Sequence, residues 1–144
     1  GFYEHHHFGK KTYPYFIHLK DRTQFALAAL WEIWKDKESG ELLHTFSIVT
    51  TEGNDLLKRI HNNQKLEGPR MPVILTEAEE DLWLAPINSA ADEEAIKRLI
   101  KPYPAEAMDA HPVKALLGKE GAGNAPGASE PYEYLELVLA DPLP

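Results

Sequence analysis

The sequence predicts an α+β fold, in which a mainly antiparallel sheet carries helices at its periphery. Three observations point to this class. Runs rich in β-forming residues, separated by short turns, fill the first third of the chain, helix patterns with N-terminal caps follow, and 144 residues suit one domain spanning 1–144. With 43% hydrophobic and 26% charged residues, the composition is that of a folded globular protein rather than a disordered one.

Two β-rich runs come first along the chain. Residues 15–19 follow Pro14 and combine aromatic with aliphatic side chains, and a second apolar run covers 25–34. We expect these runs to pair as a hairpin across Arg22 and Thr23. Because the second run lacks polar alternation, it is typical of a strand covered on both faces, although periodicity also allows a buried helix.

A charged turn and a third strand follow. Residues 36–41 centre on Ser39 and Gly40, a pair that indicates a turn. Residues 43–51 alternate between two sets of side chains. This alternation predicts a third antiparallel strand.

The first helix is predicted from its cap. Asn54 is a favourable N-cap residue, and the helix that it starts ends near His61. Apolar residues recur within it at helical spacing: Leu56, Leu57 and Ile60.

Two more helices are predicted further on. A compact apolar strand at 72–75 leads to Thr76, which forms a capping box with Glu79 for a helix that closes at 83–84. Residues 91–100 form another amphipathic helix, with acidic residues at its start and basic residues near its end, as the helix dipole favours.

The last third of the chain is less regular. Residues 118–131 contain four glycines and two prolines, so we expect a flexible loop. Residues 132–139 alternate tyrosine and leucine with glutamate and predict a closing strand or tail.

Composition excludes several kinds of function. Fifteen basic against 23 acidic residues leave a net charge of −8, so any contact with nucleic acid must be local. The chain has no cysteine, which removes thiol nucleophiles, thiolate metal sites and disulfides. It shows no signal-peptide pattern and no apolar stretch near the ~20 residues that a membrane helix needs. We therefore expect a soluble, cytoplasmic protein without membrane contact. The sequence starts at Gly1 without a Met, which suggests that it was cut from the interior of a longer chain.

Glu4 is the first candidate catalytic residue. It follows Phe2 and Tyr3, and a carboxyl group in an apolar setting can act first as a general acid and then as a base. The alternative is a glutamate at a strand edge that faces water.

His61 is the second candidate. An imidazole at a helix C-terminus can transfer protons, but it can equally stabilise the helix through the dipole without any catalytic role. Proximity to a carboxylate such as Glu4 would favour the catalytic interpretation.

Other polar residues suggest binding rather than chemistry. Arg70 precedes a strand and can bind a phosphate or pair with an acidic side chain. Thr50 can donate a hydrogen bond from its hydroxyl to a phosphate, or it can simply belong to a strand.

Of the three adjacent histidines 5–7, only His5 and His7 can share one face of a strand, so we expect no metal site. The sequence also lacks the phosphate-binding loop, the dinucleotide glycine fingerprint and the hydrolase nucleophile elbow.

Several blocks together resemble the SRAP family, the SOS response-associated peptidases, also called abasic-site processing proteins. The resemblance is strong over residues 1–84, weaker at 111–113, and corresponds to the C-terminal two-thirds of such a domain. The blocks are GFYE at 1–4, PYFI at 14–17, FALAALWE at 25–32, FSIVTT at 46–51, IHN at 60–62 and RMPVIL at 70–75.

The resemblance implies a curved antiparallel sheet and a specific chemistry. Family members protect abasic sites in single-stranded DNA by a covalent crosslink, formed by an N-terminal cysteine that is exposed when the initiator Met is removed. By motif position, Glu4 and His61 resemble the catalytic glutamate and histidine, and Thr50 and Arg70 resemble residues that line the DNA groove. The resemblance implies no cofactor and leaves the oligomeric state open.

Three departures from the family pattern matter. The cysteine is absent from these 144 residues, so this chain alone is expected to be inactive. His5 stands where the family has a tryptophan that wedges the DNA, so it is a third candidate for DNA contact. An insertion at 63–68 separates His61 from Arg70. One alternative to a crosslinking enzyme is an inactive SRAP-fold DNA-binding or scaffold protein. A second, which the family name suggests, is a thiol peptidase that acts on other proteins.

Overall fold

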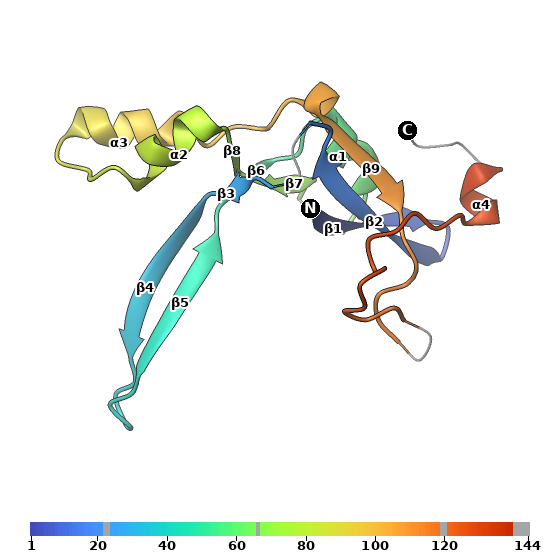
Figure 1. The fold of residues 1–144 in the computed structure, drawn as a ribbon, viewed down its shortest axis with the longest axis horizontal. Coiled ribbons are helices and arrows are strands. Elements are labelled where there is room, and N and C mark those ends of the chain that lie inside the picture. Colours follow the sequence, from blue (N-terminus) through green and yellow to red (C-terminus); the bar gives the residue numbers. More distant parts are fainter. Residues whose placement is uncertain (22–23, 66, 119–120, 140–144) are drawn as a thin grey trace. The chain divides into compact units, whose positions relative to one another are not determined.

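A computed structural model describes residues 1–21, 24–65, 67–118 and 121–139 and confirms the α+β class (Figure 1). The chain divides into two compact units, Gly1–Gln24 with Gly53–Arg70 and Pro104–Pro144, and Phe25–Glu52 with Met71–Tyr103. A single domain over 1–144 stays a prediction. Within the described residues, no helix is long and apolar enough to cross a bilayer.

Within the described part of the chain, six strands precede the first helix, and the remaining strands and helices follow it. In order they are β1 (Phe2–Phe8), β2 (Lys11–Leu19), β3 (Ala26–Leu27), β4 (Ala29–Lys35), β5 (Leu42–Ile48), β6 (Thr50–Glu52), α1 (Asp55–Ile60), β7 (Arg70–Pro72), β8 (Ile74–Leu75), α2 (Glu77–Leu84), α3 (Ala90–Lys97), a 3₁₀ turn (Ala105–Ala107), β9 (Met108–Pro112) and α4 (Leu135–Val138). The strands form a three-stranded sheet, β1-β2-β9, and the two-stranded sheets β3-β8, β4-β5 and β6-β7.

The first unit is built on the antiparallel sheet β1-β2-β9. β1 and β2 join through a tight turn in which Gly9 has φ +60°, a backbone conformation that glycine adopts readily. The predicted hairpin between 15–19 and 25–34 is therefore wrong, because β2 already lies between β1 and β9. Arg22 and Thr23, where that turn was expected, lie outside the described residues.

One face of this sheet forms the core of the first unit. From Tyr13 onward every second residue of β2 is buried, and so are Met108 and Ala110 on β9. Helix α1 lies against β1, and its three apolar residues are buried as predicted. The buried residues of β2 and α1 are Tyr13, Tyr15, Ile17, Leu19, Leu56, Leu57 and Ile60.

The caps of α1 match the prediction. The Asn54 Oδ1 accepts a hydrogen bond from the Leu57 backbone N–H at 3.0 Å, and its Nδ2 donates to the Met108 Sδ at 3.2 Å. The buried side chain of Asn54 thus caps the N-terminus of the helix and also joins the helix to β9 by a hydrogen bond. The helix ends at His61, whose backbone N–H donates to the Leu57 carbonyl at 2.7 Å.

The second unit contains a long hairpin, β4-β5, in which Ala29 pairs with Ile48 and Lys35 with Leu42. Its turn is the predicted one. The Asp36 carboxylate accepts three hydrogen bonds, from the Ser39 N–H and hydroxyl and from the Glu38 N–H. These bonds, those from Ser39 first, lower the pKa of Asp36.

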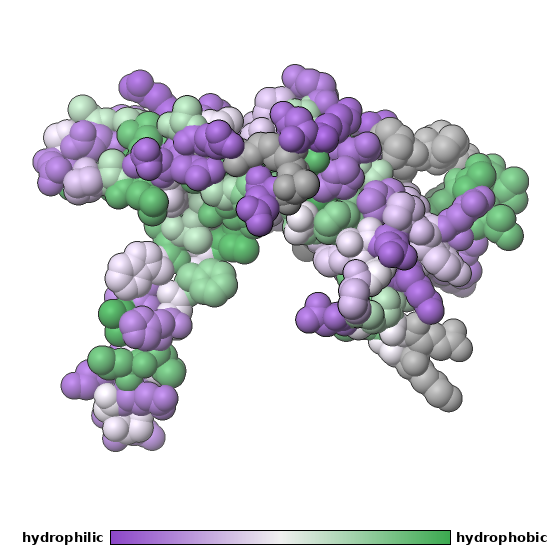
Figure 2. Space-filling model, in the orientation of Figure 1, coloured by the Kyte–Doolittle hydropathy of each residue, from purple (hydrophilic) through white to green (hydrophobic). Residues whose placement is uncertain are grey.

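The prediction that 25–34 is one strand covered on both faces is wrong. The run breaks at Ala28, whose N–H donates to the Val73 carbonyl and whose carbonyl accepts from the Val49 N–H. Its two parts pair with different partners, β3 with β8 and β4 with β5. Within the described residues β4 is paired only with β5, and its large apolar side chains are exposed, with Trp31 at 74%. Figure 2 shows hydrophobic surface along this hairpin. The predicted strand at 43–51 is likewise divided, between β5 and β6.

The core of the second unit lies where α2 and the short strands meet. Ala28, Val73, Leu75 and Leu99 are buried together, and the half-buried Trp83 packs against them. The capping box of α2 forms as predicted, since both the N–H and the hydroxyl of Thr76 donate to Glu79 Oε2, at 3.0 and 2.8 Å. Helix α3 begins at Ala90 and ends at Lys97, shorter than the predicted 91–100.

The predicted closing strand at 132–139 is wrong, because these residues contain helix α4. Tyr134 and Leu137, one helical turn apart, point inward: the Tyr134 hydroxyl donates to the Val113 carbonyl, and Leu137 is buried. Glu136 accepts hydrogen bonds from Lys11 Nζ at 2.8 Å and from the Tyr13 hydroxyl at 2.9 Å. These contacts to β2 favour a helical turn over extended backbone.

The region predicted as a flexible loop, 118–131, is irregular in its described part. Residues 119–120 lie outside the described residues. The N–H groups of Ala122 and Gly123 donate to the carbonyls of Ala115 and Leu116, and further turns follow. Flexibility of this region stays a prediction.

Glu79 makes the stability of the second unit depend on pH. Its pKa falls from 4.5 to about 2, first through the hydrogen bond from Lys101 and then through the bonds from Thr76. A lowered pKa adds stability above pH 4.5, and this stability is lost as the pH falls toward 2. We expect Glu79→Gln to cost about 1 kcal/mol at pH 7 and to flatten the loss of stability between pH 4.5 and 2. Urea unfolding at several pH values measures both effects.

The exposed Asp81 on the same helix provides the matched control. Asp81→Asn should leave the pH dependence close to that of the unmodified chain. If Glu79→Gln gives the same curve as the unmodified chain between pH 4.5 and 2, the Lys101 and Thr76 contacts contribute no net stability.

Candidate functional site

Glu4 lies in the middle of β1, on the face that is turned toward the core. Side chains of the strand alternate, so Phe2, Glu4 and His6 are half-buried, whereas Tyr3 and His5 are exposed. The Glu4 side chain is 23% exposed. The alternative of a glutamate that simply faces water therefore does not describe its position.

His61 lies directly opposite Glu4. It follows the last residue of α1, and α1 lies against β1. The His61 Nδ1 is 3.6 Å from the Glu4 Oε2, and the His61 side chain is 17% exposed. Two residues that are far apart in the sequence thus form one partly buried carboxylate–imidazole pair.

The second acceptor near the imidazole is a backbone carbonyl. The His61 Nδ1 lies 3.4 Å from the carbonyl oxygen of Arg70. Because a carbonyl oxygen only accepts, a hydrogen bond in this contact requires the proton on Nδ1. Neutral His61 then has its lone pair on Nε2, which is the nitrogen able to take a proton from a substrate.

Arg70 reaches this position at the end of the inserted loop. It begins β7, its side chain is exposed, and the neighbouring Pro69 carbonyl accepts a hydrogen bond from the Gly53 N–H at 2.8 Å. This bond ties the end of the loop to the residue before the N-cap of α1. The insertion therefore leaves the Arg70 backbone beside His61.

The other two predicted DNA-binding residues are placed differently. His5 is exposed on the face of β1 opposite to Glu4, and its register partner on β2 is Pro14. Thr50 is exposed at the start of β6 and belongs to the second unit. Of the predicted site residues, the structure thus groups Glu4, His61 and the backbone of Arg70.

Sequence reasoning gave no site role to two polar residues beside this pair. The His6 Nδ1 donates to the Arg59 carbonyl at 3.1 Å, and the Asn62 side chain makes two hydrogen bonds to the backbone of His7. The one available signal was an asparagine placed directly after a candidate catalytic histidine. Among the residues that the structure describes, no three His, Asp or Glu side chains lie close enough together to hold a metal ion.

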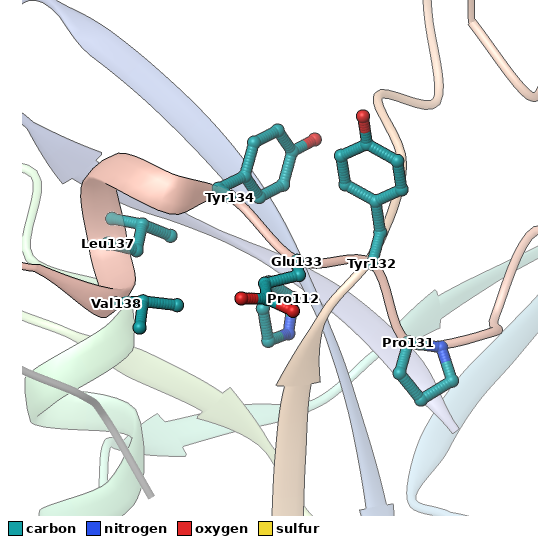
Figure 3. Close-up of a pocket in the computed structure, with 7 residues that line it drawn as sticks. All are labelled: Pro112, Pro131, Tyr132, Glu133, Tyr134, Leu137 and Val138. Carbon is teal, nitrogen blue, oxygen red and sulfur yellow. The ribbon is translucent and has the colours of Figure 1, made fainter.

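A separate pocket of about 370 Å³ lies in the C-terminal segment (Figure 3). In Figure 3, Leu137 and Val138 project from α4 on one side, and the rings of Tyr132 and Tyr134 lie on another. Its remaining lining residues are Pro112, Pro131 and Glu133. One carboxylate and two phenols in a mainly apolar lining offer no acid–base pair like that of Glu4 and His61.

Comparisons with known proteins identify the family of the chain. The profile of the family described as SOS response associated peptidase (SRAP) matches residues 1–120. The abasic site processing protein YoqW of Bacillus subtilis is 40% identical over 118 residues, which make up 81% of this chain and 48% of the relative. The abasic site processing protein HMCES of Gallus gallus is 28% identical and matches 81% of this chain and 37% of its own length.

A solved structure shows the same fold. A protein from Bacteroides thetaiotaomicron superimposes with a TM-score of 0.79 at 37% identity, covering 92% of this chain and 54% of that protein. The chain spans about half the length of the Bacillus relatives that it matches. On the family profile and these relatives, the chain belongs to the SRAP family.

Proposed function

We propose that this chain takes part in abasic-site processing, and that the intact protein links covalently to abasic sites in single-stranded DNA. The observation that carries this proposal is the Glu4 carboxylate 3.6 Å from the His61 imidazole. Such a pair suits a reaction that needs protons moved in both directions at one carbon atom. The names of the relatives, which are abasic site processing proteins, support the substrate.

The proposed reaction joins an aldehyde to an N-terminal cysteine that lies outside these 144 residues. The ring-opened sugar of an abasic site presents the aldehyde. The cysteine amine adds to it, and loss of one water leaves an imine. The thiol then adds across the C=N bond, with sulfur on carbon and the proton on nitrogen, which closes a thiazolidine ring. Removal of the initiator Met, by hydrolysis of one peptide bond, would expose that cysteine.

Glu4 and His61 have complementary roles in this proposal. Glu4 moves protons while the sugar ring opens and while water leaves the carbinolamine. His61 accepts or returns a proton through Nε2, which assists ring opening and the reverse reaction. Both side chains are largely shielded from water, which strengthens their electrostatic interaction with a developing charge.

DNA binding is proposed to rest on local contacts. Arg70 would hold a phosphate beside the acid–base pair, and Thr50 and His5 are further candidate contacts. The net charge of −8 argues against attraction by the chain as a whole. We also propose a cytoplasmic location for this activity.

An alternative function is non-covalent DNA binding or scaffolding by an inactive SRAP fold. The observation in its favour is that the 144 residues contain no cysteine. Incubation with single-stranded DNA that carries one abasic site, followed by denaturation, separates the two functions. A complex of the intact protein that survives denaturation supports crosslinking, and reversible binding alone supports the alternative. The 144-residue chain by itself should give no such complex through sulfur.

Glu4→Gln tests the carboxylate in the intact protein. It keeps the size of the side chain but removes its ability to exchange a proton, so we expect crosslinking at least ten-fold slower. DNA affinity should change less than two-fold. The rate is measured by denaturing electrophoresis at a single turnover, and an unchanged rate would remove Glu4 from the mechanism.

His61→Ala separates catalysis from helix capping. The C-cap hydrogen bond is made by the His61 backbone, which alanine retains, so the stability loss should stay near 1 kcal/mol. Formation or reversal of the crosslink should slow at least ten-fold. A large fall in melting temperature, with normal crosslinking in the protein that remains folded, would instead assign His61 a structural role.

Arg70→Gln tests the phosphate contact. Each phosphate neutralised on single-stranded DNA contributes about −0.7 to the slope of log affinity against log salt. We expect this variant to be less salt-dependent by about that amount, measured by fluorescence anisotropy from 50 to 300 mM salt. Arg98→Gln, at the exposed C-cap of α3, is the control and should leave the slope unchanged. A flat slope for the unmodified protein would contradict phosphate binding altogether.

A further inference from the structure

We propose that Asn62 is a positioning residue, whose side-chain amide holds the end of α1 on the edge of β1 and thereby sets the Glu4–His61 contact. The role in DNA chemistry rests on the proposed function. The positioning itself is a property of the folded chain and is tested without DNA.

Two hydrogen bonds carry the inference. The His7 backbone N–H donates to Asn62 Oδ1 at 2.7 Å, and Asn62 Nδ2 donates to the His7 carbonyl at 2.9 Å. Among the described residues, β1 is the outer strand of the sheet β1-β2-β9, so one of its edges has no neighbouring strand. The amide of Asn62 therefore bonds both backbone groups of one residue, as a residue of a further strand does.

A third bond makes the attachment rigid. The His6 Nδ1 donates to the Arg59 carbonyl at 3.1 Å, in the last turn of α1. The bonds from residues 6 and 7 thus reach the chain on both sides of His61. The attachment at Arg59 restricts rotation of the helix end about the attachment at Asn62, and the reverse also holds. His61, which lies between the two, therefore keeps its orientation.

The geometry of the acid–base pair is sensitive to this attachment. At 3.6 Å, the Nδ1–Oε2 distance lies just beyond the 2.7–3.2 Å of a good hydrogen bond. A small shift closes the contact, and an equally small shift in the other direction loses it. Displacements near 1 Å can change reaction rates about 100-fold, so a residue that fixes the helix end acts on the chemistry without touching substrate.

The chemistry of the contact requires an amide at this position. One donor and one acceptor are used at once, a combination that aspartate, serine and alanine side chains cannot reproduce in the same geometry. Asn62→Ala removes both bonds. Asn62→Asp keeps the size and the acceptor but loses the Nδ2 donor, so it tests the contact with the smallest change in packing.

The first test is NMR on the 144-residue chain in the absence of DNA. We expect Asn62→Ala to speed hydrogen exchange of the His7 amide at least ten-fold. The ¹⁵N shifts of the His61 ring, which report the nitrogen that carries the proton, should move from the Nδ1–H form toward a mixture of both forms. Asn62→Asp should change both signals in the same direction, and it serves as the test if the alanine variant does not fold.

Asn63→Ala is the matched control. Asn63 is the next amide along the chain, and its Oδ1 accepts only a local bond from the Lys65 N–H. This variant should leave the His7 exchange rate and the His61 ring shifts unchanged. Unchanged signals in both Asn62 variants, with the fold intact, would overturn the proposal.

The second test is crosslinking by the intact protein. Asn62→Ala should slow it at least ten-fold while DNA affinity changes less than two-fold, and Asn63→Ala should have no effect. Loss of affinity in proportion to rate would overturn the positioning role, because it would show a DNA contact. If the unmodified protein forms no crosslink, the proposed function fails, and the NMR result alone decides whether Asn62 positions His61.

Discussion

Three hydrogen bonds between the end of α1 and the edge of β1 hold the candidate site together. An edge strand exposes N–H and C=O groups that would otherwise be open to pairing with another chain. Here the Asn62 amide uses one such pair of groups, and the His6 imidazole binds the helix end. This docking brings His61 to Glu4, and the remaining features of the site are arranged around that pair.

Part of the negative charge of the chain lies in two helices that are distant from this pair in the sequence. Many acidic side chains lie in α2 and α3, where they serve caps and ion pairs. Lys97 lies 2.7 Å from Glu93 and 3.3 Å from Glu94, and Lys101 lies 2.8 Å from Glu79. These pairs neutralise part of the acidic charge near the two helices, and a net charge of −8 over the whole chain is compatible with a local phosphate contact elsewhere.

The second half of the apolar run at 25–34 lies in the exposed β4-β5 hairpin. Trp31 and Phe46 stand directly opposite each other and are 74% and 76% exposed. Isolated two-stranded hairpins are only marginally stable in water. This hairpin is closed at its tip by the Asp36 hydrogen bonds and anchored at its base by the bonds of Ala28 to Val73 and Val49.

The sequence by itself determined the local features of this protein. The Asn54 cap, the Thr76–Glu79 capping box and the turn at Asp36 depend on residues three or four apart, so short-range rules suffice to predict them. Motif order also singled out Glu4 and His61 by resemblance.

Only the tertiary structure decided which strands pair and what lies beside the two candidate catalytic residues. The run at 25–34 reads as one strand, but its partners are chosen by long-range hydrogen bonds that no local pattern encodes. The alternation at 132–139 became a helical turn because Glu136 meets Lys11 and Tyr13. The Glu4–His61 distance is likewise set by the docking of a helix on a strand edge, a contact between residues more than 50 positions apart.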